Sequence, residues 1–150
     1  MLRKLGQYLG GCFRMILLGS VMLSGVGCSS PEELTPEQAS ALVQRVEDRW
    51  QTIINRDFGA TWEFASPNYR RVFSKRMYLG NFSYGLDWEL TGIEVLNYDG
   101  RAAVASVVAR VMTKSTKPTS AASKALGSRP ISIRERWMFI DGEWWHIANI

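Results

Sequence analysis

ISIRERWMFIDGEWWHIANI, residues 131–150, is the stretch that decides the fold. Two runs rich in β-branched and aromatic residues, 131–140 and 143–150, flank the pair Asp141-Gly142. An Asp-Gly pair between two such runs is a strong signal for a β-hairpin with a short turn. We therefore predict that the chain closes on a long antiparallel hairpin.

The turn length also predicts which side chains share a face of this hairpin. Because directly opposed residues of antiparallel strands share a face, a two-residue turn places Trp137 and His146 together. The first face then carries Ile131, Ile133, Glu135, Trp137, Phe139, Trp144, His146, Ala148 and Ile150. The second face carries Arg134, Arg136, Met138, Glu143, Trp145, Ile147 and Asn149. The first face is more apolar, so we expect it to line a concave, helix-covered side; a one-residue slip would exchange the faces.

A second hairpin and a basic loop are predicted upstream. Residues 88–98 and 101–113 have the same β-rich texture on either side of Asp99-Gly100. Residues 114–130 join the two hairpins, show no periodicity and contain basic residues but no acidic one. Such a long connection is unusual inside a compact domain. We expect a solvated crossover, with docking on an anionic lipid or cell-wall polymer as the alternative.

A long helix is predicted to begin the domain. Thr35 can cap it, Pro36 suits the first helical position, and Gln38 completes a capping box. Polar residues, Arg49 among them, are expected on the solvent face of a helix over 36–57. The apolar face has helical spacing and consists of Ala39, Leu42, Val43, Val46, Trp50, Ile53 and Ile54.

Shorter helical segments should follow the long helix. Residues 60–65 are expected to form one turn, and Ser66-Pro67 starts a further helix by the same cap-then-proline logic. Val72 is expected on the apolar side of that helix, and a last turn is expected near 75–79. Helices first and antiparallel strands afterwards predict an α+β fold with the helices segregated on one face of the sheet.

This order of elements resembles the NTF2-like superfamily, which includes SnoaL-like cyclases and ketosteroid isomerases. The residues that carry the resemblance are the long helix with Trp50, the segment WEFASPNYR at 62–70, ERW at 135–137 and DGEWWHI at 141–147. The resemblance implies a cone in which a long N-terminal helix and short helices pack on a curved four-stranded antiparallel sheet. It does not identify a reaction, because one fold hosts many functions.

The first 27 residues are predicted to be a signal peptide. A basic, acid-free start precedes an uncharged apolar run at 15–27, which is too short to span a bilayer. The sequence SGVGC at 24–28 resembles a lipobox, although Gly25 stands where Leu is preferred. We expect a lipid on Cys28, a tether at 28–34 and one domain at 35–150. The alternatives are an ordinary secreted protein cut nearby and an uncleaved N-terminal anchor.

The predicted compartment is the cell envelope, with the domain facing the periplasm. Ser29 follows the cysteine, which by resemblance to Gram-negative lipoproteins favours the outer membrane. The whole sequence has a formal charge of +4, but three of its basic residues lie in the leader. Without them, 15 basic residues face 14 acidic ones, and the formal charge is +1. That near-neutral balance argues against nucleic-acid binding. No metal or cofactor is expected, because His146 is the only histidine and both cysteines lie at or before position 28.

Glu135 and His146 are the candidate catalytic residues, since they are the only ionisable groups on the apolar face. In a cavity they could form a proton-transfer pair, with burial raising the pKa of the Glu and a partner raising that of the His. The simpler interpretation is that Glu135 and His146 pair with each other and have a purely structural role. The aromatic residues that we expect either in the core or lining a ligand pocket are Trp50, Trp62, Tyr69 and Trp137.

The second face predicts an association surface. Met138, Trp145 and Ile147 form an apolar patch that Arg134 and Arg136 flank. The resemblance implies use of such a face for a homodimer or an envelope protein partner. We therefore expect a non-catalytic domain that binds a small apolar ligand or assembles with a partner. The alternative is an isomerase, cyclase or hydrolase that uses Glu135 and His146.

Overall fold

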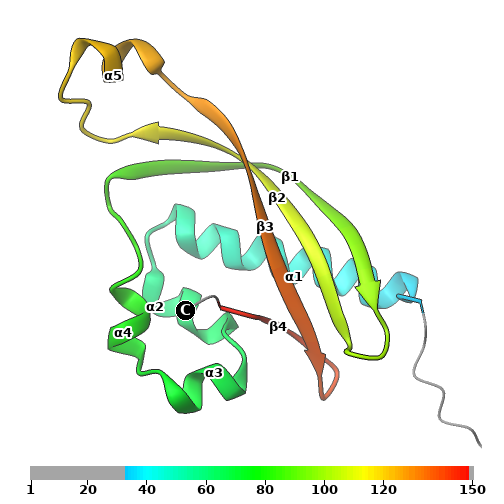
Figure 1. The fold of residues 1–150 in the computed structure, drawn as a ribbon. Coiled ribbons are helices and arrows are strands. Elements are labelled where there is room, and N and C mark those ends of the chain that lie inside the picture. The colour runs from blue at the N-terminus through cyan, green and yellow to red at the C-terminus, as the bar shows by residue number, and fades with distance from the viewer. Residues whose placement is uncertain (1–32, 149–150) are drawn as a thin grey trace, which may run out of the picture.

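The computed structural model describes residues 33–148 as one α+β domain (Figure 1). The predicted signal peptide, Cys28 and most of the tether lie outside these residues, as do Asn149 and Ile150. No helix within 33–148 is long and apolar enough to cross a membrane.

Helix α1 (Pro36–Ile54) begins as predicted. Thr35 Oγ1 accepts a hydrogen bond from the backbone N–H of Gln38 at 3.2 Å, and Gln38 Oε1 accepts one from the N–H of Thr35 at 3.1 Å. The helix ends before residue 57, where we predicted its end, because Arg56 adopts a left-handed φ of 59°. The chain can then turn, and Asp57 caps the next helix.

Four short helical segments lead from α1 to the sheet: α2 (Phe58–Thr61), the 3₁₀ turn η1 (Trp62–Phe64), α3 (Pro67–Val72) and α4 (Lys75–Leu79). Ser66 caps α3 as predicted, and Ser74 caps α4, each accepting a backbone N–H bond at 3.3 Å. Val72 departs from the prediction. It is 74 % exposed, because it stands at the last position of a helix too short to pack its whole apolar side.

The sheet has four antiparallel strands in the order β1-β2-β3-β4. They are β1 (Leu86–Asp99), β2 (Val104–Ser115), β3 (Arg129–Ile140) and β4 (Glu143–His146). The first hairpin corrects the prediction, because Asp99 pairs with Val104 and the turn is therefore longer than Asp99-Gly100. The Asp99 carboxylate stabilises the longer turn by accepting the N–H groups of Arg101 and Ala102. Strand β4 also ends earlier than predicted.

The register of the closing hairpin is confirmed. Ile140 pairs with Glu143 and Trp137 with His146, so Asp141 and Gly142 form the two-residue turn. Both turn residues have positive φ, 51° and 84°, which suits this type of turn. Glu135, Trp137, Trp144 and His146 therefore share the inner face of the sheet, as the alternation predicts.

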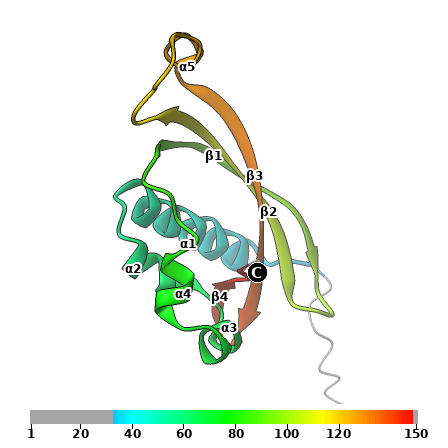
Figure 2. The same cartoon turned by 60° about the vertical axis from the view of Figure 1, so that its left-hand side comes forward.

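Helix α1 crosses the inner face of the curved sheet, and the short helices close the cone below it (Figures 1 and 2). The core forms where α1 meets β2 and the closing hairpin, and Leu42, Val46, Val107 and Trp137 are fully buried there. A long N-terminal helix and short helices thus pack on a curved four-stranded antiparallel sheet (Figure 1), and the predicted α+β fold class is confirmed.

The basic connection is more ordered than predicted. Strands β2 and β3 continue into it, to Ser115 and from Arg129, and α5 (Ala121–Leu126) forms at its tip. Figures 1 and 2 show that the end of this hairpin reaches beyond the helices, so α5 stands apart from the body of the domain. We call α5 and the strand ends that carry it the α5 arm.

Candidate functional site

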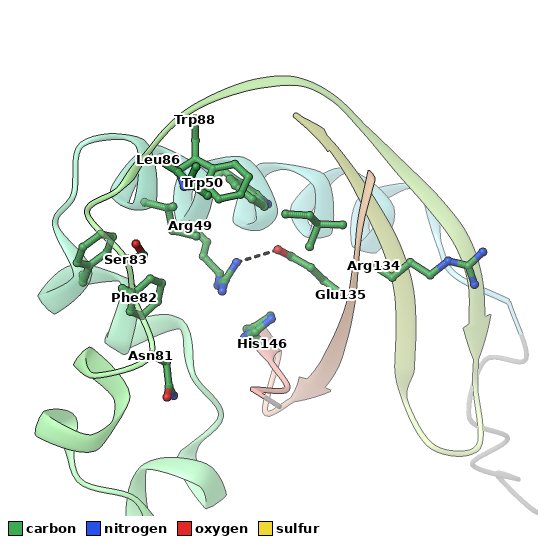
Figure 3. A pocket seen from close by; sticks show the side chains of 13 residues that line it. Arg49, Trp50, Asn81, Phe82, Ser83, Leu86, Trp88, Arg134, Glu135 and His146 are labelled. Atoms are coloured by element: carbon green, nitrogen blue, oxygen red, sulfur yellow. Dashed lines mark hydrogen bonds and ion pairs between the residues drawn. The ribbon is translucent and has the colours of Figure 1, made fainter. Parts of the chain in front are cut away.

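A cavity of about 380 Å³ opens between α1, the inner face of the sheet and the segment before β1. Figure 3 shows the side chains around it. Most of its wall is apolar or aromatic, formed by Trp50, Ile53, Phe58, Phe82, Leu86, Trp88 and Ile133. Its polar lining consists of Arg49, Asn81, Ser83, Arg134, Glu135 and His146. The volume and composition are those of a small-molecule pocket.

A buried ion pair forms the polar centre of the cavity. Arg49 Nη1 donates to Glu135 Oε1 at 2.8 Å, and the two residues are only 7 % and 5 % exposed (Figure 3). Trp137 Nε1 donates to the other carboxylate oxygen of Glu135 at 2.9 Å. Each carboxylate oxygen therefore has a donor from the protein, and the charge of Arg49 is balanced inside the site.

The position of Arg49 corrects the sequence prediction, which placed it on the solvent face of the long helix. Arg49 follows Val46 by three residues and precedes Ile53 by four, so it lies in the buried stripe of α1. This spacing is the signal that could have found it. A charged residue is tolerated there because Glu135 on β3 supplies the opposite charge.

His146 lies beside this pair but is not its partner. Its ring meets Trp137 edge-on, with ring centroids 5.5 Å apart, and its Nδ1 atom is buried without a hydrogen-bond partner within residues 33–148. Burial, and to a lesser extent the charge of Arg49, lowers the pKa of His146 well below its usual value. The predicted rise in the pKa of His146 is therefore wrong, because burial lowers that pKa and Glu135 pairs with Arg49 instead of with His146.

Two further hydrogen-bond donors near the cavity are unsatisfied. Arg49 Nε and the indole Nε1 of Trp50 are buried and have no partner in the described part of the chain. An unmet buried donor costs about 1–3 kcal/mol, so such groups usually meet water or a ligand. Arg49, Trp50 and His146 all line the cavity, and each carries one buried polar atom without a hydrogen-bond partner among the described residues.

Tyr78 borders this arrangement from α4. Its hydroxyl donates to the backbone oxygen of Thr61 at 3.3 Å, and desolvation by burial raises its pKa. Arg49 acts in the opposite direction, through its charge and a side-chain hydrogen bond, and lowers the pKa of Tyr78. Tyr78 thus serves to hold α4 against the core while it faces the ion pair.

Of the four aromatic residues predicted for a ligand pocket, only Trp50 lines this cavity. Trp62 and Tyr69 pack in a second aromatic cluster with Tyr78. Trp137 is fully buried and contributes through its hydrogen bond to Glu135. Sequence reasoning missed the lining residues Phe82 and Leu86, which come from the segment before β1 and from its first position. No local pattern in the sequence shows that this segment folds over α1.

The predicted association patch is partly covered. Arg45 and Arg70 lie over the ring of Trp145, 5.5 and 5.1 Å from its centroid, and Arg45 Nε also donates to the backbone oxygen of Trp144. Met138 and Ile147 are partly buried, whereas Arg134 and Arg136 are exposed. The two guanidinium groups therefore cover the ring of Trp145, the largest apolar side chain of the predicted patch.

Comparisons with known proteins bear on the fold alone. No protein-family model matches the sequence, and no curated protein matches it. Among solved structures, Aln2 from a Streptomyces species is 15 % identical, with a TM-score of 0.44 over 75 % of this chain and 87 % of that one. A scytalone dehydratase-like protein from Novosphingobium aromaticivorans is 14 % identical, with a TM-score of 0.47 over 73 % and 79 %. The association domain of C. elegans CaMKII is 13 % identical, with a TM-score of 0.44 over 74 % and 92 %.

Proposed function

We propose that this chain is an envelope-anchored lipoprotein whose domain binds a small, mainly apolar molecule that carries a neutral hydrogen-bond acceptor. The observation that carries the binding role is an aromatic cavity of about 380 Å³ whose lining residues hold three buried polar atoms that have no hydrogen-bond partner within residues 33–148. The anchor rests on the lipobox-like sequence that ends at Cys28.

The charge balance of the cavity sets the character of the ligand. Arg49 is neutralised by Glu135, and the lowered pKa of His146 keeps its ring uncharged near neutral pH. An anionic ligand would have to compete with Glu135 for Arg49 and leave a carboxylate buried without its counter-charge. A carbonyl, ether or ester oxygen can instead accept from a free donor such as Trp50 Nε1 without disturbing the ion pair.

The same contacts favour binding over proton transfer. A general base works best with a pKa near the working pH, and burial moves the pKa of His146 away from that range. Glu135 already accepts from Arg49 and Trp137. The alternative, an isomerase, cyclase or hydrolase that uses Glu135 and His146, would require the ion pair to open during turnover.

Binding of matched aromatic probes tests the proposed ligand class. We expect 2-acetylnaphthalene to bind the native chain about three- to tenfold more tightly than 2-ethylnaphthalene. This ratio corresponds to the net free energy of one hydrogen bond, which only the ketone can accept. Trp50→Phe, which removes the indole N–H, should abolish this difference. Isothermal titration calorimetry with both probes measures it.

Trp62→Phe is the matched control, because Trp62 is similarly buried but belongs to the second cluster. It should leave the preference for the ketone intact. Equal affinity of the native chain for both probes, or binding of neither, would contradict the proposed ligand class. Tighter binding of 2-naphthoate than of the ketone would contradict the neutral character of the site.

Metabolic labelling tests the anchor. Cells that express the native chain should incorporate labelled palmitate into a product that has lost its leader, and Cys28→Ser should abolish both labelling and processing. Cys12→Ser is the control, since these are the only two cysteines and Cys12 lies within the predicted leader. Labelling that persists in Cys28→Ser, or a native chain that is never labelled, would exclude lipidation at this position.

A further inference from the structure

A second pocket, of about 340 Å³, lies at the outer face of the sheet, and we call it the outer pocket. Arg134 and Arg136 alternate along β3 with the inner-face residue Glu135, and Figure 3 shows Arg134 directed to the other side of the strand from Glu135. The outer pocket also reaches the edge of β3 beyond its last pair with β4, Trp137 with His146, so that Glu135 and His146 border it as well as the inner cavity. Its lining consists of Leu96, Ser106, Arg134, Glu135, Arg136, His146 and Ile147.

The outer pocket carries positive charge without a counter-charge. Arg134 and Arg136 are both exposed, and neither forms an ion pair or a side-chain hydrogen bond with any residue between 33 and 148. Glu135 supplies the one carboxylate of the lining, and that carboxylate already pairs with Arg49 at 2.8 Å. Two guanidinium groups are therefore free to bind an anion from solution.

The two arginines are placed to bind one anion together. Residues two apart on a strand project from the same face, with their Cα atoms about 7 Å apart, and long side chains from such positions can converge on one group. Ser106 lies directly opposite Arg136 on β2, so its hydroxyl belongs to the same face. Glu94, the residue of β1 in the same cross-strand row as Arg134, is paired with Arg110 and does not compete. The planar guanidinium group matches a carboxylate, which it binds through two parallel hydrogen bonds.

Apolar side chains border the arginines on both sides. Leu96 is 43 % exposed and stands at a bulge of β1, where the register with β2 shifts. A bulge of this kind re-aims a side chain. On the other side, Ile147 is held beside β3 because its N–H donates to the backbone oxygen of Arg136 at 2.8 Å. An anion with an apolar body therefore fits the lining better than a bare inorganic ion does.

We propose that the outer pocket binds a small aliphatic carboxylate. Arg134 and Arg136 hold the carboxylate group, the Ser106 hydroxyl donates to it, and the aliphatic body lies against Leu96 and Ile147. This site is additional to the ligand cavity of the proposed function. The guanidinium groups of the outer pocket have no internal partner, whereas Arg49 in the inner cavity is already neutralised, so the two sites select ligands of different charge.

Binding of hexanoate and its uncharged counterpart 1-hexanol tests the carboxylate requirement. Isothermal titration calorimetry at low salt should show hexanoate binding at least about tenfold more tightly than 1-hexanol, because only the carboxylate accepts charge-assisted hydrogen bonds. Arg136→Gln should weaken hexanoate binding by about tenfold, and Arg134→Gln combined with Arg136→Gln should abolish the preference for hexanoate. Arg129→Gln is the matched control, because Arg129 is also an exposed arginine of β3 but does not line the outer pocket.

Competition separates this site from the inner cavity. Saturating hexanoate should leave the affinity for 2-acetylnaphthalene unchanged, and displacement of the ketone would place hexanoate in the inner cavity and overturn the proposal. If the ketone does not bind at all, the inner site fails while the hexanoate titrations still decide the outer one. Equal affinity for hexanoate and 1-hexanol, or an equal loss in Arg129→Gln, would overturn the carboxylate site. Acetate or inorganic phosphate binding as tightly as hexanoate would overturn the role of the aliphatic body.

Discussion

Arg49→Ala is expected to lower the free energy of unfolding by about 3–5 kcal/mol, the usual cost of breaking a buried ion pair from one side. The side chains of Arg49 and Glu135 are only 9 % and 3 % exposed, so the carboxylate left behind would be buried without its counter-charge. Trp137 Nε1 would still donate to it, but one neutral donor does not replace a guanidinium group. Denaturant unfolding followed by tryptophan fluorescence measures the loss.

A surface ion pair provides the control. Arg56 and Asp87 approach to 2.6 Å, but their side chains are 39 % and 60 % exposed, so Arg56→Ala should cost at most about 1 kcal/mol. Arg49→Met combined with Glu135→Gln should recover much of the loss, because no buried charge remains and the amide oxygen can still accept from Trp137. Equal costs for Arg49→Ala and Arg56→Ala would contradict the buried pair.

Local chemistry made much of the fold predictable. The Asp141-Gly142 turn fixes the register of the closing hairpin, and with it the inner face that carries Glu135 and His146. The caps at Thr35 and Ser66 fix where α1 and α3 begin. These features depend on residues close together in the chain, so a single sequence contains all the information needed.

The features that the sequence did not predict depend on contacts between distant segments. Arg49 and Glu135 lie 86 positions apart, and either charge alone gives no sign of the other. Arg45 and Arg70 cover Trp145 from α1 and α3, which strand alternation cannot reveal. The candidate site was therefore only half predictable: Glu135, His146 and Trp50 were found, but the ion pair that determines their chemistry was not.

The buried pair is also the reason why we propose a neutral ligand for the cavity and not a proton relay. Arg49 holds the carboxylate and, by its charge, disfavours a second positive charge on His146. The site therefore has a fixed polar centre inside an aromatic wall. In the proposed function, donors such as Trp50 Nε1, which has no partner within residues 33–148, orient an acceptor-bearing molecule without a change in protonation.

Protonation of His146 is expected to make the domain unstable in mild acid. The folded-state pKa of His146 lies below its unfolded value of about 6.5, because burial and the charge of Arg49 disfavour the imidazolium. Below that pH the unfolded chain binds a proton that the folded chain does not. The free energy of unfolding should therefore fall by up to about 1.4 kcal/mol for each pH unit below about 6.5, until the folded-state pKa is reached.

Comparing the native chain with His146→Gln isolates the contribution of His146 to the pH dependence of the free energy of unfolding. His146 is the only histidine in the sequence, and histidine is the side chain whose ordinary pKa lies nearest the window between about pH 5 and 6.5, so the difference between the two chains in this window reports His146. Denaturant unfolding at closely spaced pH values should give a steep dependence for the native chain and a flat one for the variant. Parallel curves would mean that His146 accepts its proton equally well in both states, and that neither its burial nor Arg49 opposes the imidazolium.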